Sequence, residues 1–346
     1  ILRSLVGSEM CIRDRNNIHR KKVFNMSYKV LIIGAGAVGV AMAASLSEEG
    51  MDVTVYSKSH TADCIEENGV KRCGIFKEIS VPTGKVKVIR NYGEACQAYD
   101  YIIISAKTMA DEEIAKSLDN NRNIIAPEGK IVIFQNGWGN DEVFLKYFDK
   151  NEVYNARIIT GFERVTPENS KVTVHTAPIL LGSLYGADNS CMEPLAAAIN
   201  NSGIPSEVSA DIGKALWAKM LFNTTLNPLG AILNSSYGEL SESESACDIM
   251  NQLIDETYSV LLAEHLETFW RTPDEYRKVF YEKLVPDTYK HRSSTLQDIE
   301  KGQKTEIDTL NGCIISLARR NGIDVPGHRM IYKLIKSIEE KMLTSK

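Results

Sequence analysis

The sequence predicts two domains, an α/β domain built on a parallel sheet and an all-helical domain that follows it. Three observations carry this prediction. Short apolar runs alternate with helical segments in the first half, a glycine-rich motif follows the first of these runs, and apolar residues recur at helical spacing after about residue 210. A chain of 346 residues is long enough for each domain to bury a core of its own.

Four short apolar runs mark the expected strands of the first domain. They are Lys29–Ile33 (KVLII), Asp52–Tyr56 (DVTVY), residues 101–105 (YIIIS) and residues 130–134 (KIVIF). Residues 40–49, between the first two runs, are rich in Ala, Met and Leu and predict a helix. Strands that alternate with helices predict a parallel sheet with crossover helices.

A GxGxxG motif stands between the first predicted strand and the first predicted helix. Gly34 permits a tight turn, Gly36 lets the backbone approach a pyrophosphate, and Gly39 lets the helix pack closely on the strand. A structural glycine turn is the alternative, but the strand before and the helix after favour dinucleotide binding in a Rossmann-type domain. The motif residues expected at the cofactor are Gly34, Ala35, Gly36, Ala37, Val38 and Gly39.

The end of the second predicted strand indicates which nicotinamide cofactor fits. NAD enzymes place Asp or Glu there, about 20 residues after the motif, to bind the ribose 2′-hydroxyl. This chain has Tyr56, Ser57 and Lys58 instead. Lys58 and the hydroxyls would attract a 2′-phosphate, so the sequence favours NADP(H). The alternative is that Lys58 is an ordinary solvated lysine.

The first 25 residues are set aside. Residues 5–15 (LVGSEMCIRDR) resemble one reading frame of a transposon-end adaptor used in sequencing libraries, and Met26 is the expected start of the natural protein. A secretory signal would need an apolar stretch of about 7–15 residues, which this segment lacks. Because the segment is basic, a transit peptide is the remaining alternative.

Charge and cysteine content exclude several classes of protein. The chain carries a net charge of −5, of which residues 1–25 contribute +4, so the remainder carries −9. Such an acidic body without a basic run argues against nucleic acid as a partner. Its cysteines are scattered without a CxxC motif, which predicts reduced thiols, a cytoplasmic location and no metal site. No apolar run reaches the 18 or so residues of a membrane helix.

The second half of the chain has the pattern of a helical domain. Apolar residues fall on one expected helix face at Met250, Leu253, Ile254, Leu261 and Leu262, and residues 333–342 predict a final amphipathic helix. We place the domain boundary near residue 210, which gives a nucleotide-binding domain at 26–209 and a helical domain at 210–346. The cleft between them is the expected ligand site.

Three polar residues, Lys219, Asn223 and Asn227, are spaced four apart in an otherwise apolar segment. Four residues on a helix rotate a side chain by only about 40°, so the three share one face. Buried polar groups must be satisfied or functional. An exposed polar stripe explains the pattern equally well.

Ser294 and Glu306 form a second candidate pair. Twelve residues of unbroken helix would separate them by about 18 Å, too far for one small substrate. If both residues serve one site, the chain should bend near Gly302. Taken alone, Ser294 is most simply a helix cap and Glu306 a surface carboxylate.

Together these segments resemble the ketopantoate reductase (2-dehydropantoate 2-reductase) family from residue 30 to about residue 336. The motifs that carry the resemblance occur in the family's order. They are Gly34–Gly39 (GAGAVG), Ala106-Lys107, Gln135-Asn136-Gly137, Lys219 with Asn223 and Asn227-Pro228-Leu229, Ser293-Ser294, Thr305-Glu306-Ile307-Asp308 with Asn311-Gly312, and Gly322-Ile323-Asp324-Val325-Pro326.

The resemblance implies roles for these positions. Lys219 resembles the general acid of the family, and Glu306 its partner near the reacting oxygen. Asn223, Asn227 and Ser294 resemble the residues that hold the substrate. Asn136 and Lys107 resemble residues on the nicotinamide and substrate side of the cleft, Lys58 falls where an arginine usually binds the 2′-phosphate, and Glu142 matches an acid near the adenosine ribose. The second domain would be of the 6-phosphogluconate dehydrogenase C-terminal-like type.

The resemblance therefore implies NADPH-dependent reduction of ketopantoate, a small 2-oxo acid, to (R)-pantoate by a monomer or homodimer. The residues at Trp138, 161–164, Thr295 and Lys304 depart from the family pattern and leave the substrate open. Two alternatives remain: reduction of another 2-oxo acid or oxidation of a 3-hydroxy acid with NADP, and a non-catalytic NADP-binding sensor. Retention of Lys219 and Glu306 counts against the sensor.

Overall fold

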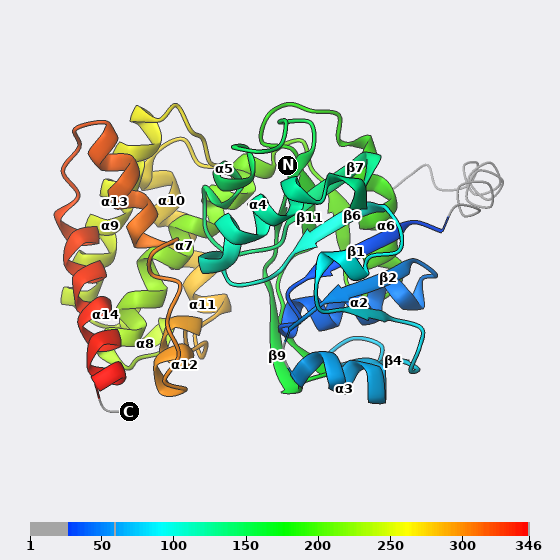
Figure 1. Ribbon diagram of the computed structural model, residues 1–346. Helices are drawn as coiled ribbons and strands as arrows, with labels where there is room; N and C mark the ends of the chain where they lie inside the picture. Colours follow the sequence, from blue (N-terminus) through cyan, green and yellow to red (C-terminus); the bar gives the residue numbers. More distant parts are fainter. Residues whose placement is uncertain (1–26, 59, 345–346) are drawn as a thin grey trace, which may run out of the picture.

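The computed structural model describes residues 27–58 and 60–344. Figure 1 shows an α/β half and a helical half side by side, which confirms the predicted fold class. The segment at residues 1–25, set aside above, lies outside the described residues, and its interpretation stays a prediction.

Eight strands of the described chain form the main sheet, in the order β12-β11-β8-β7-β6-β1-β2-β5. Neighbouring strands are parallel except β8 and β11. β1 lies between β2 and β6, so the loop after β1 lies where the strand order reverses, the usual place for a ligand in open α/β sheets. The strands are β1 (Lys29–Ile33), β2 (Asp52–Tyr56), β5 (Lys87–Ile89), β6 (Tyr99–Ile104), β7 (Ile125–Ile133), β8 (Val153–Arg157), β11 (Ile179–Gly182) and β12 (Ser206–Val208).

Helix α2 (Ala37–Glu48) packs between the main sheet and a smaller sheet. Gly39 to Leu46 are all buried, as expected for a helix that is apolar on every side. The smaller sheet, in the order β4-β3-β10-β9, was not predicted because its strands are short and rich in polar residues. They are β3 (Val70–Gly74), β4 (Ile79–Val81), β9 (Thr160–Thr166) and β10 (Asn169–His175).

Other helices complete the α/β half. α4 packs on the face of the main sheet that includes Leu31, Ile102 and Ile131, whereas α6 joins the core on the side of α2. The sheet is therefore covered on both faces, as a parallel sheet requires. These helices are α3 (His60–Asn68), α4 (Asp111–Asn120), α5 (Asn140–Phe144) and α6 (Glu193–Asn201).

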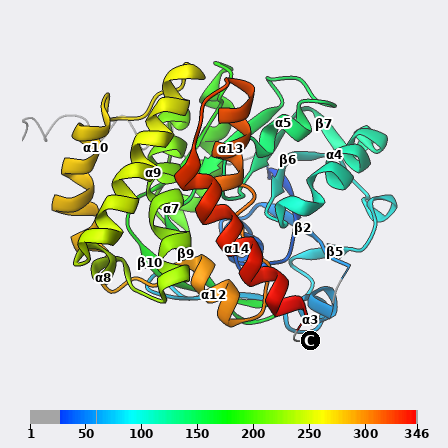
Figure 2. The ribbon, with the colours of Figure 1, turned by 90° about the vertical axis from the view of Figure 1, so that its left-hand side faces the viewer.

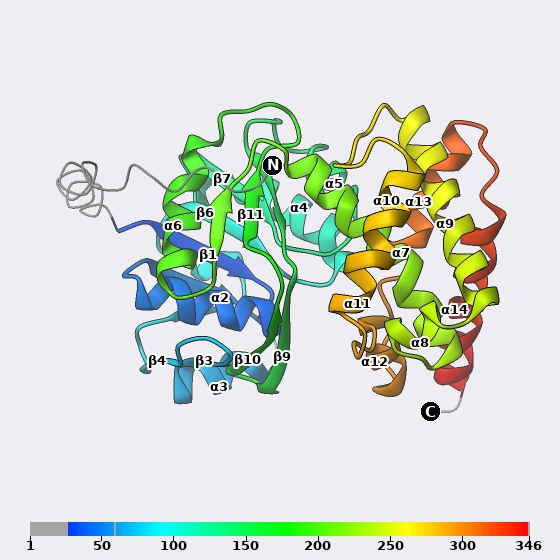
Figure 3. The same ribbon diagram turned by 180° about the vertical axis from the view of Figure 1, so that it is seen from behind.

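The helical half is built around α7 (Ile212–Leu233), which begins just after β12 and passes through its core. Its first turns pack on Leu180 of the main sheet. Figure 2 shows α14 lying across α7, and Figures 1 and 3 show this half from opposite sides. The surrounding helices are α8 (Tyr237–Ser241), α9 (Glu244–Ala263), α10 (Pro273–Val279), α11 (Val285–Asp287), α12 (Ser294–Glu300), α13 (Asn311–Arg320) and α14 (Pro326–Thr344).

The predicted apolar face on α9 is correct except at its last member. Met250, Leu253, Ile254 and Leu261 are buried, whereas the Leu262 side chain is 79% exposed. Consecutive residues on a helix lie about 100° apart, so burial of Leu261 turns Leu262 toward solvent. The final predicted helix lies within α14.

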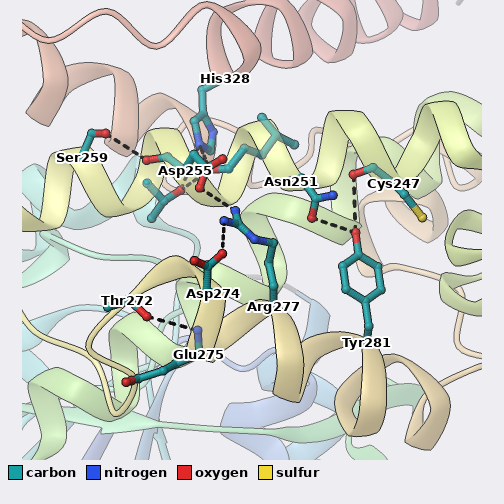
Figure 4. A network of polar contacts seen from close by, with 12 residues as sticks. Cys247, Asn251, Asp255, Ser259, Thr272, Asp274, Glu275, Arg277, Tyr281 and His328 are labelled. Carbon is teal, nitrogen blue, oxygen red and sulfur yellow. Dashed lines mark hydrogen bonds and ion pairs between the residues drawn. The ribbon is translucent and has the colours of Figure 1, made fainter.

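Polar contacts join α9 to the segment that follows it, as Figure 4 shows. Arg277 of α10 donates hydrogen bonds to Asp255 of α9 and to Asp274. One turn earlier on α9, the Tyr281 hydroxyl lies 3.1 Å from Asn251 Oδ1 and donates to it. These contacts orient α10 against the core, although exposed ion pairs add only about 0–1 kcal/mol each to stability.

In the described part of the chain, no helix is long and apolar enough to cross a membrane. Nor do three or more His, Cys, Asp or Glu side chains come together there in an arrangement that could hold a metal ion.

Candidate active site

The glycine motif forms a tight turn between β1 and α2. At Gly34 φ is +109°, and an added Cβ would lie 2.4 Å from the backbone nitrogen of Ala106. A Cβ on Gly39 would lie 1.9 Å from the carbonyl oxygen of Gly34. At Gly36, in contrast, a Cβ would meet nothing within 4 Å, so no neighbouring protein atom requires glycine there. This open space before the α2 N-terminus fits the pyrophosphate of a dinucleotide.

A cavity of about 410 Å³ lies beside this turn. Gly34, Ala35, Tyr56, Lys58 and Glu113 are among its lining residues. The Lys58 Nζ lies 3.5 Å from Glu113 Oε1 and 5.7 Å from the centre of the Tyr56 ring. The sequence analysis missed Glu113. Its signal was the run of three acidic residues at the start of α4, after β6.

Glu142 is not among the residues that line this cavity. It lies in α5, where its negative charge contributes to raising the pKa of Cys313 in α13 to about 12, after the larger effect of burial. The structure thus places Glu142 beside the helical half and does not bring it to the cavity beside Gly34.

Three predicted residues meet at the junction of the two halves. Lys219 Nζ donates a 2.5 Å hydrogen bond to Asn136 Oδ1, and Asn136 Nδ2 donates a 3.0 Å hydrogen bond to Glu306 Oε2. The nucleotide-binding half supplies Asn136, from the loop after β7, and the helical half supplies the other two. Lys107 lies at the same place, with its Nζ 3.9 Å from Glu306 Oε1. The lysine and the glutamate are joined through an amide.

The Lys219 ammonium is held in a protein environment that disfavours its charge. The side chain keeps some exposure to the cleft, but protein atoms surround the ammonium densely, and this desolvation lowers the pKa of Lys219 to about 8. The charge of Glu306 opposes the shift, and that of Arg157 adds to it. Lys219 is therefore mostly protonated at pH 7 and still acidic enough to release a proton.

The loop that carries Asn136 is held by close contacts on both sides. Gly137 has φ of +100°, and an added Cβ would lie 2.7 Å from Thr309 Cβ in the helical half. The ring of Trp138 packs on that of Trp217 on α7, with the two ring centroids 4.9 Å apart. Asn140 Nδ2 donates a hydrogen bond of 2.8 Å to the carbonyl oxygen of Asn136. These contacts fix the Asn136 amide between its two charged partners.

The three polar residues of the stripe on α7 differ in how deeply they are buried. Lys219 and Asn223 are half-buried, whereas Asn227 is 4% exposed. The Tyr237 hydroxyl donates a 2.6 Å hydrogen bond to Asn227 Oδ1. Lys219 therefore reaches the junction, where it bonds Asn136, whereas Asn227 lies within the helical core.

Pro228, next to Asn227, interrupts the hydrogen bonds of α7. Proline has no N–H, so the carbonyl oxygen of Thr224, four residues earlier, loses its helical partner. Asn311 Nδ2 donates a hydrogen bond of 3.0 Å to that oxygen. The same Nδ2 lies 3.0 Å from His328 Nδ1. Asn311 thus repairs the gap that the proline leaves, a role that the sequence analysis did not assign.

The chain breaks between Ser294 and Glu306, as predicted. α12 ends at Glu300, and Gly302 follows with φ of +64°. The helix cap is Ser293, whose hydroxyl accepts a hydrogen bond from Leu296 N–H, so the reading of Ser294 as the cap is wrong. Ser294 is exposed, one turn before Asp298, whose pKa burial raises and the charge of Lys107 lowers. Ser294 and Asp298 share a face of α12.

The sequence analysis missed a further charged residue, Arg157. It ends β8 and is 7% exposed, and its Nε and Nη1 atoms are buried without a hydrogen-bond partner. Its sequence signal was weak, because one arginine at the end of a predicted strand does not show which way the side chain points.

Comparisons with known proteins show the family to which this chain belongs. The family model described as "Ketopantoate reductase PanE/ApbA" matches residues 30–185, and that of the "Ketopantoate reductase PanE/ApbA C terminal" domain matches residues 211–339. A curated 2-dehydropantoate 2-reductase of Aquifex aeolicus is 35% identical over 91% of this chain and 98% of its own length.

Solved structures show the same fold. A PanE/ApbA family ketopantoate reductase from Ralstonia eutropha superposes with a TM-score of 0.77 at 26% identity, over 91% of this chain and 99% of that one. A D-mandelate dehydrogenase with NADH and anilino(oxo)acetate superposes with a TM-score of 0.78 at 22% identity, with the same coverage of both chains. From its two family matches and its curated relative, the chain belongs to the ketopantoate reductase family of oxidoreductases.

Proposed function

We propose that this chain reduces ketopantoate to (R)-pantoate with NADPH, a step in the synthesis of pantothenate and coenzyme A. The observation that carries the proposal is the hydrogen-bonded series Lys219–Asn136–Glu306 at the junction of the two halves. The name of the Aquifex aeolicus relative supports the substrate. In this proposal residues 26–209 bind the cofactor and residues 210–346 supply the acid. The free thiols of the described chain fit a cytoplasmic enzyme.

Reduction of a ketone requires a hydride on the carbonyl carbon and a proton on the carbonyl oxygen. Bound NADPH would supply the hydride. Lys219 donates the proton from Nζ to the carbonyl oxygen as negative charge develops there. Asn136 orients the ammonium through its Oδ1, and Glu306, through the Asn136 amide, supports the charged form of the lysine. Lys219 is reprotonated from solvent, since it keeps some exposure to the cleft.

Substrate contacts in this proposal come from both sides of the cleft. Asn223 lies one turn beyond Lys219 on the same face of α7, and Ser294 lies on the face of α12 that includes Asp298. We assign the hydroxyl of the substrate to these residues and their neighbours. Asn227 lies deeper and supports this wall through Tyr237.

The direct test is consumption of NADPH by the chain from Met26 onward, with ketopantoate beside a panel of 2-oxo acids. Rapid turnover of ketopantoate would support the proposal. Turnover of other 2-oxo acids alone would keep the mechanism and overturn the substrate. Benzoylformate belongs in the panel, because a D-mandelate dehydrogenase shares the fold. Tight NADPH binding with no turnover of any acid would favour a sensor.

The choice of NADPH over NADH can be tested with two opposed variants. Lys58→Ala should weaken NADPH binding roughly three- to tenfold and leave NADH binding unchanged, because it removes a cation from the 2′-phosphate. Glu113→Gln should strengthen NADPH binding, because Glu113 now pairs with Lys58 and would repel the phosphate. Equal effects of either variant on both cofactors, measured by fluorescence titration, would contradict the assignment.

A further inference from the structure

Arg157 is a buried cation without a partner. Its Nε and Nη1 atoms are buried and make no hydrogen bond, and in the described part of the chain no carboxylate forms an ion pair with it. Glu207 is near enough to act on it electrostatically but is itself exposed. A buried charge destabilises a protein unless it is paired. Such a residue therefore indicates an anion that binds at this place.

The strand register places Arg157 beside the proposed acid. β7 and β8 are parallel with Ile133 opposite Asn155, so Arg157 lies level with residue 135, at the start of the loop that carries Asn136. On its other side Arg157 faces Leu180 of β11, which packs on Leu216 of α7, one turn before Lys219. Independently, the positive charge of Arg157 lowers the pKa of Lys219. The two cations therefore lie close together at the carboxyl edge of the sheet.

A second buried arginine shows what a structural role looks like in the same fold. Arg72 of β3 is 1% exposed, and its Nη1 and Nη2 atoms donate hydrogen bonds of 2.5–3.1 Å to Ser45, to both the hydroxyl and the carbonyl oxygen of Ser202, and to the Lys77 carbonyl oxygen. It joins α2 to the segment after α6. Arg157 makes no comparable contacts, so structural cohesion does not explain its burial.

We propose that Arg157 binds the carboxylate of the 2-oxo acid substrate. In a 2-oxo acid the carboxylate carbon is bonded directly to the carbonyl carbon, so a group that binds the carboxylate must lie beside the group that protonates the carbonyl oxygen. Arg157 and Lys219 have this arrangement. Because Nε and Nη1 are enclosed by protein, we assign Nη2, the remaining guanidinium nitrogen, as the donor to a carboxylate oxygen. The inference rests on the proposed reduction of a 2-oxo acid but does not require that acid to be ketopantoate.

The test compares Arg157→Met and Arg157→Lys with the wild type in the presence of NADPH. We expect Arg157→Met to weaken binding of 2-oxoisovalerate, measured by calorimetry, about 30- to 1000-fold, the usual range for loss of one partner of a buried charge pair. Arg157→Lys keeps the charge on a differently shaped head group, so its loss should be intermediate. The methyl ester of the same acid has no carboxylate, and its binding should change less than threefold.

Two controls separate substrate binding from damage to the fold. Arg122→Met removes an exposed arginine that pairs with Asp119 at the surface, and it should leave acid binding unchanged. Arg157→Met should keep NADPH affinity and melt no lower than the wild type, because it removes an unpaired buried charge; a lowered melting temperature would indicate a structural role. Equal acid binding by wild type and Arg157→Met, or no binding by either, would overturn the inference. If Arg157→Met lost acid binding but the wild type did not reduce ketopantoate, the proposed function alone would be overturned.

Discussion

Helix α7 carries two polar regions that differ in how their groups are satisfied. In its C-terminal half, here called the inner end, Asn227 is hydrogen-bonded to Tyr237 and the Thr224 carbonyl oxygen to Asn311, both within the helical half of the molecule. In its N-terminal half, here called the outer end, Lys219 reaches across the junction to Asn136 and lies beside the unpaired Arg157. Asn227 and the Thr224 carbonyl oxygen thus find their partners within one domain, whereas Lys219, which we assign to chemistry, bonds across the junction.

The largest expected effect lies at the outer end. Lys219→Ala should lower kcat about 10²- to 10⁴-fold, the usual loss for removal of a general acid, while the unfolding midpoint stays near that of the wild type. Lys214→Ala is a matched control, because Lys214 lies on the same helix and pairs with Asp211 and Glu267 at the surface. A loss below tenfold for Lys219→Ala, with substrate and cofactor saturating, would exclude Lys219 as the acid.

At the inner end the expected effect is on stability. Asn311→Ala leaves the Thr224 carbonyl oxygen unpaired and should lower the free energy of unfolding by about 1–3 kcal/mol. Pro228→Ala supplies the missing N–H to that oxygen, so the double variant should lose less than the two single losses added together. Urea unfolding of all four proteins measures this coupling. Strict additivity would show that Asn311 does not substitute for the proline.

The outer end should also govern the pH dependence of the reaction. Desolvation lowers the pKa of Lys219 to about 8, and the general acid must be protonated. The rate of reduction should therefore be level below about pH 8 and fall about tenfold per unit above it. Arg157→Met should move this limb to higher pH, because it removes a nearby positive charge. An unmoved limb in that variant would place Arg157 away from the lysine.

The smallest expected effect belongs to His328, in the inner region. Burial lowers the pKa of His328 below its ordinary value of 6.5, and the side chain is neutral in the fold. The unfolded chain therefore binds more protons below pH 6.5, and stability falls there by up to about 1.4 kcal/mol per pH unit. The stability gap between wild type and His328→Gln should narrow between pH 7.5 and pH 5.5. A constant gap would contradict a neutral buried histidine.

Much of the fold was predictable because local pattern determines it. β1 and β2 have the predicted bounds, since a continuous apolar run is typical of a strand buried on both faces. The break after α12 follows from Gly302, and the error at Leu262 from the width of one helix face. The smaller sheet could not be predicted, because strands such as Asn169–His175 become buried only on the side that meets α2.

The candidate site was predictable in its members more than in its connections. The resemblance named Lys219, Asn136 and Glu306, but only the packing of two domains shows that the amide of Asn136 stands between the other two. Lys219 follows Asn136 by 83 positions in the sequence, and Glu306 follows it by 170. Asn311 acts on Thr224, 87 positions away, and nothing in the sequence around Arg157 shows that its side chain is buried without a partner.

The loop at Gly137 also has a consequence for how the two halves fit. An added Cβ would lie 2.7 Å from Thr309 Cβ and 2.8 Å from its carbonyl oxygen, so the backbone of Gly137 packs directly against Thr309. An added methyl group there would push the two domains apart at the place where Asn136 bridges them. Gly137→Ala should therefore reduce turnover although it removes no reacting side chain, because the site requires the two domains to lie this close together.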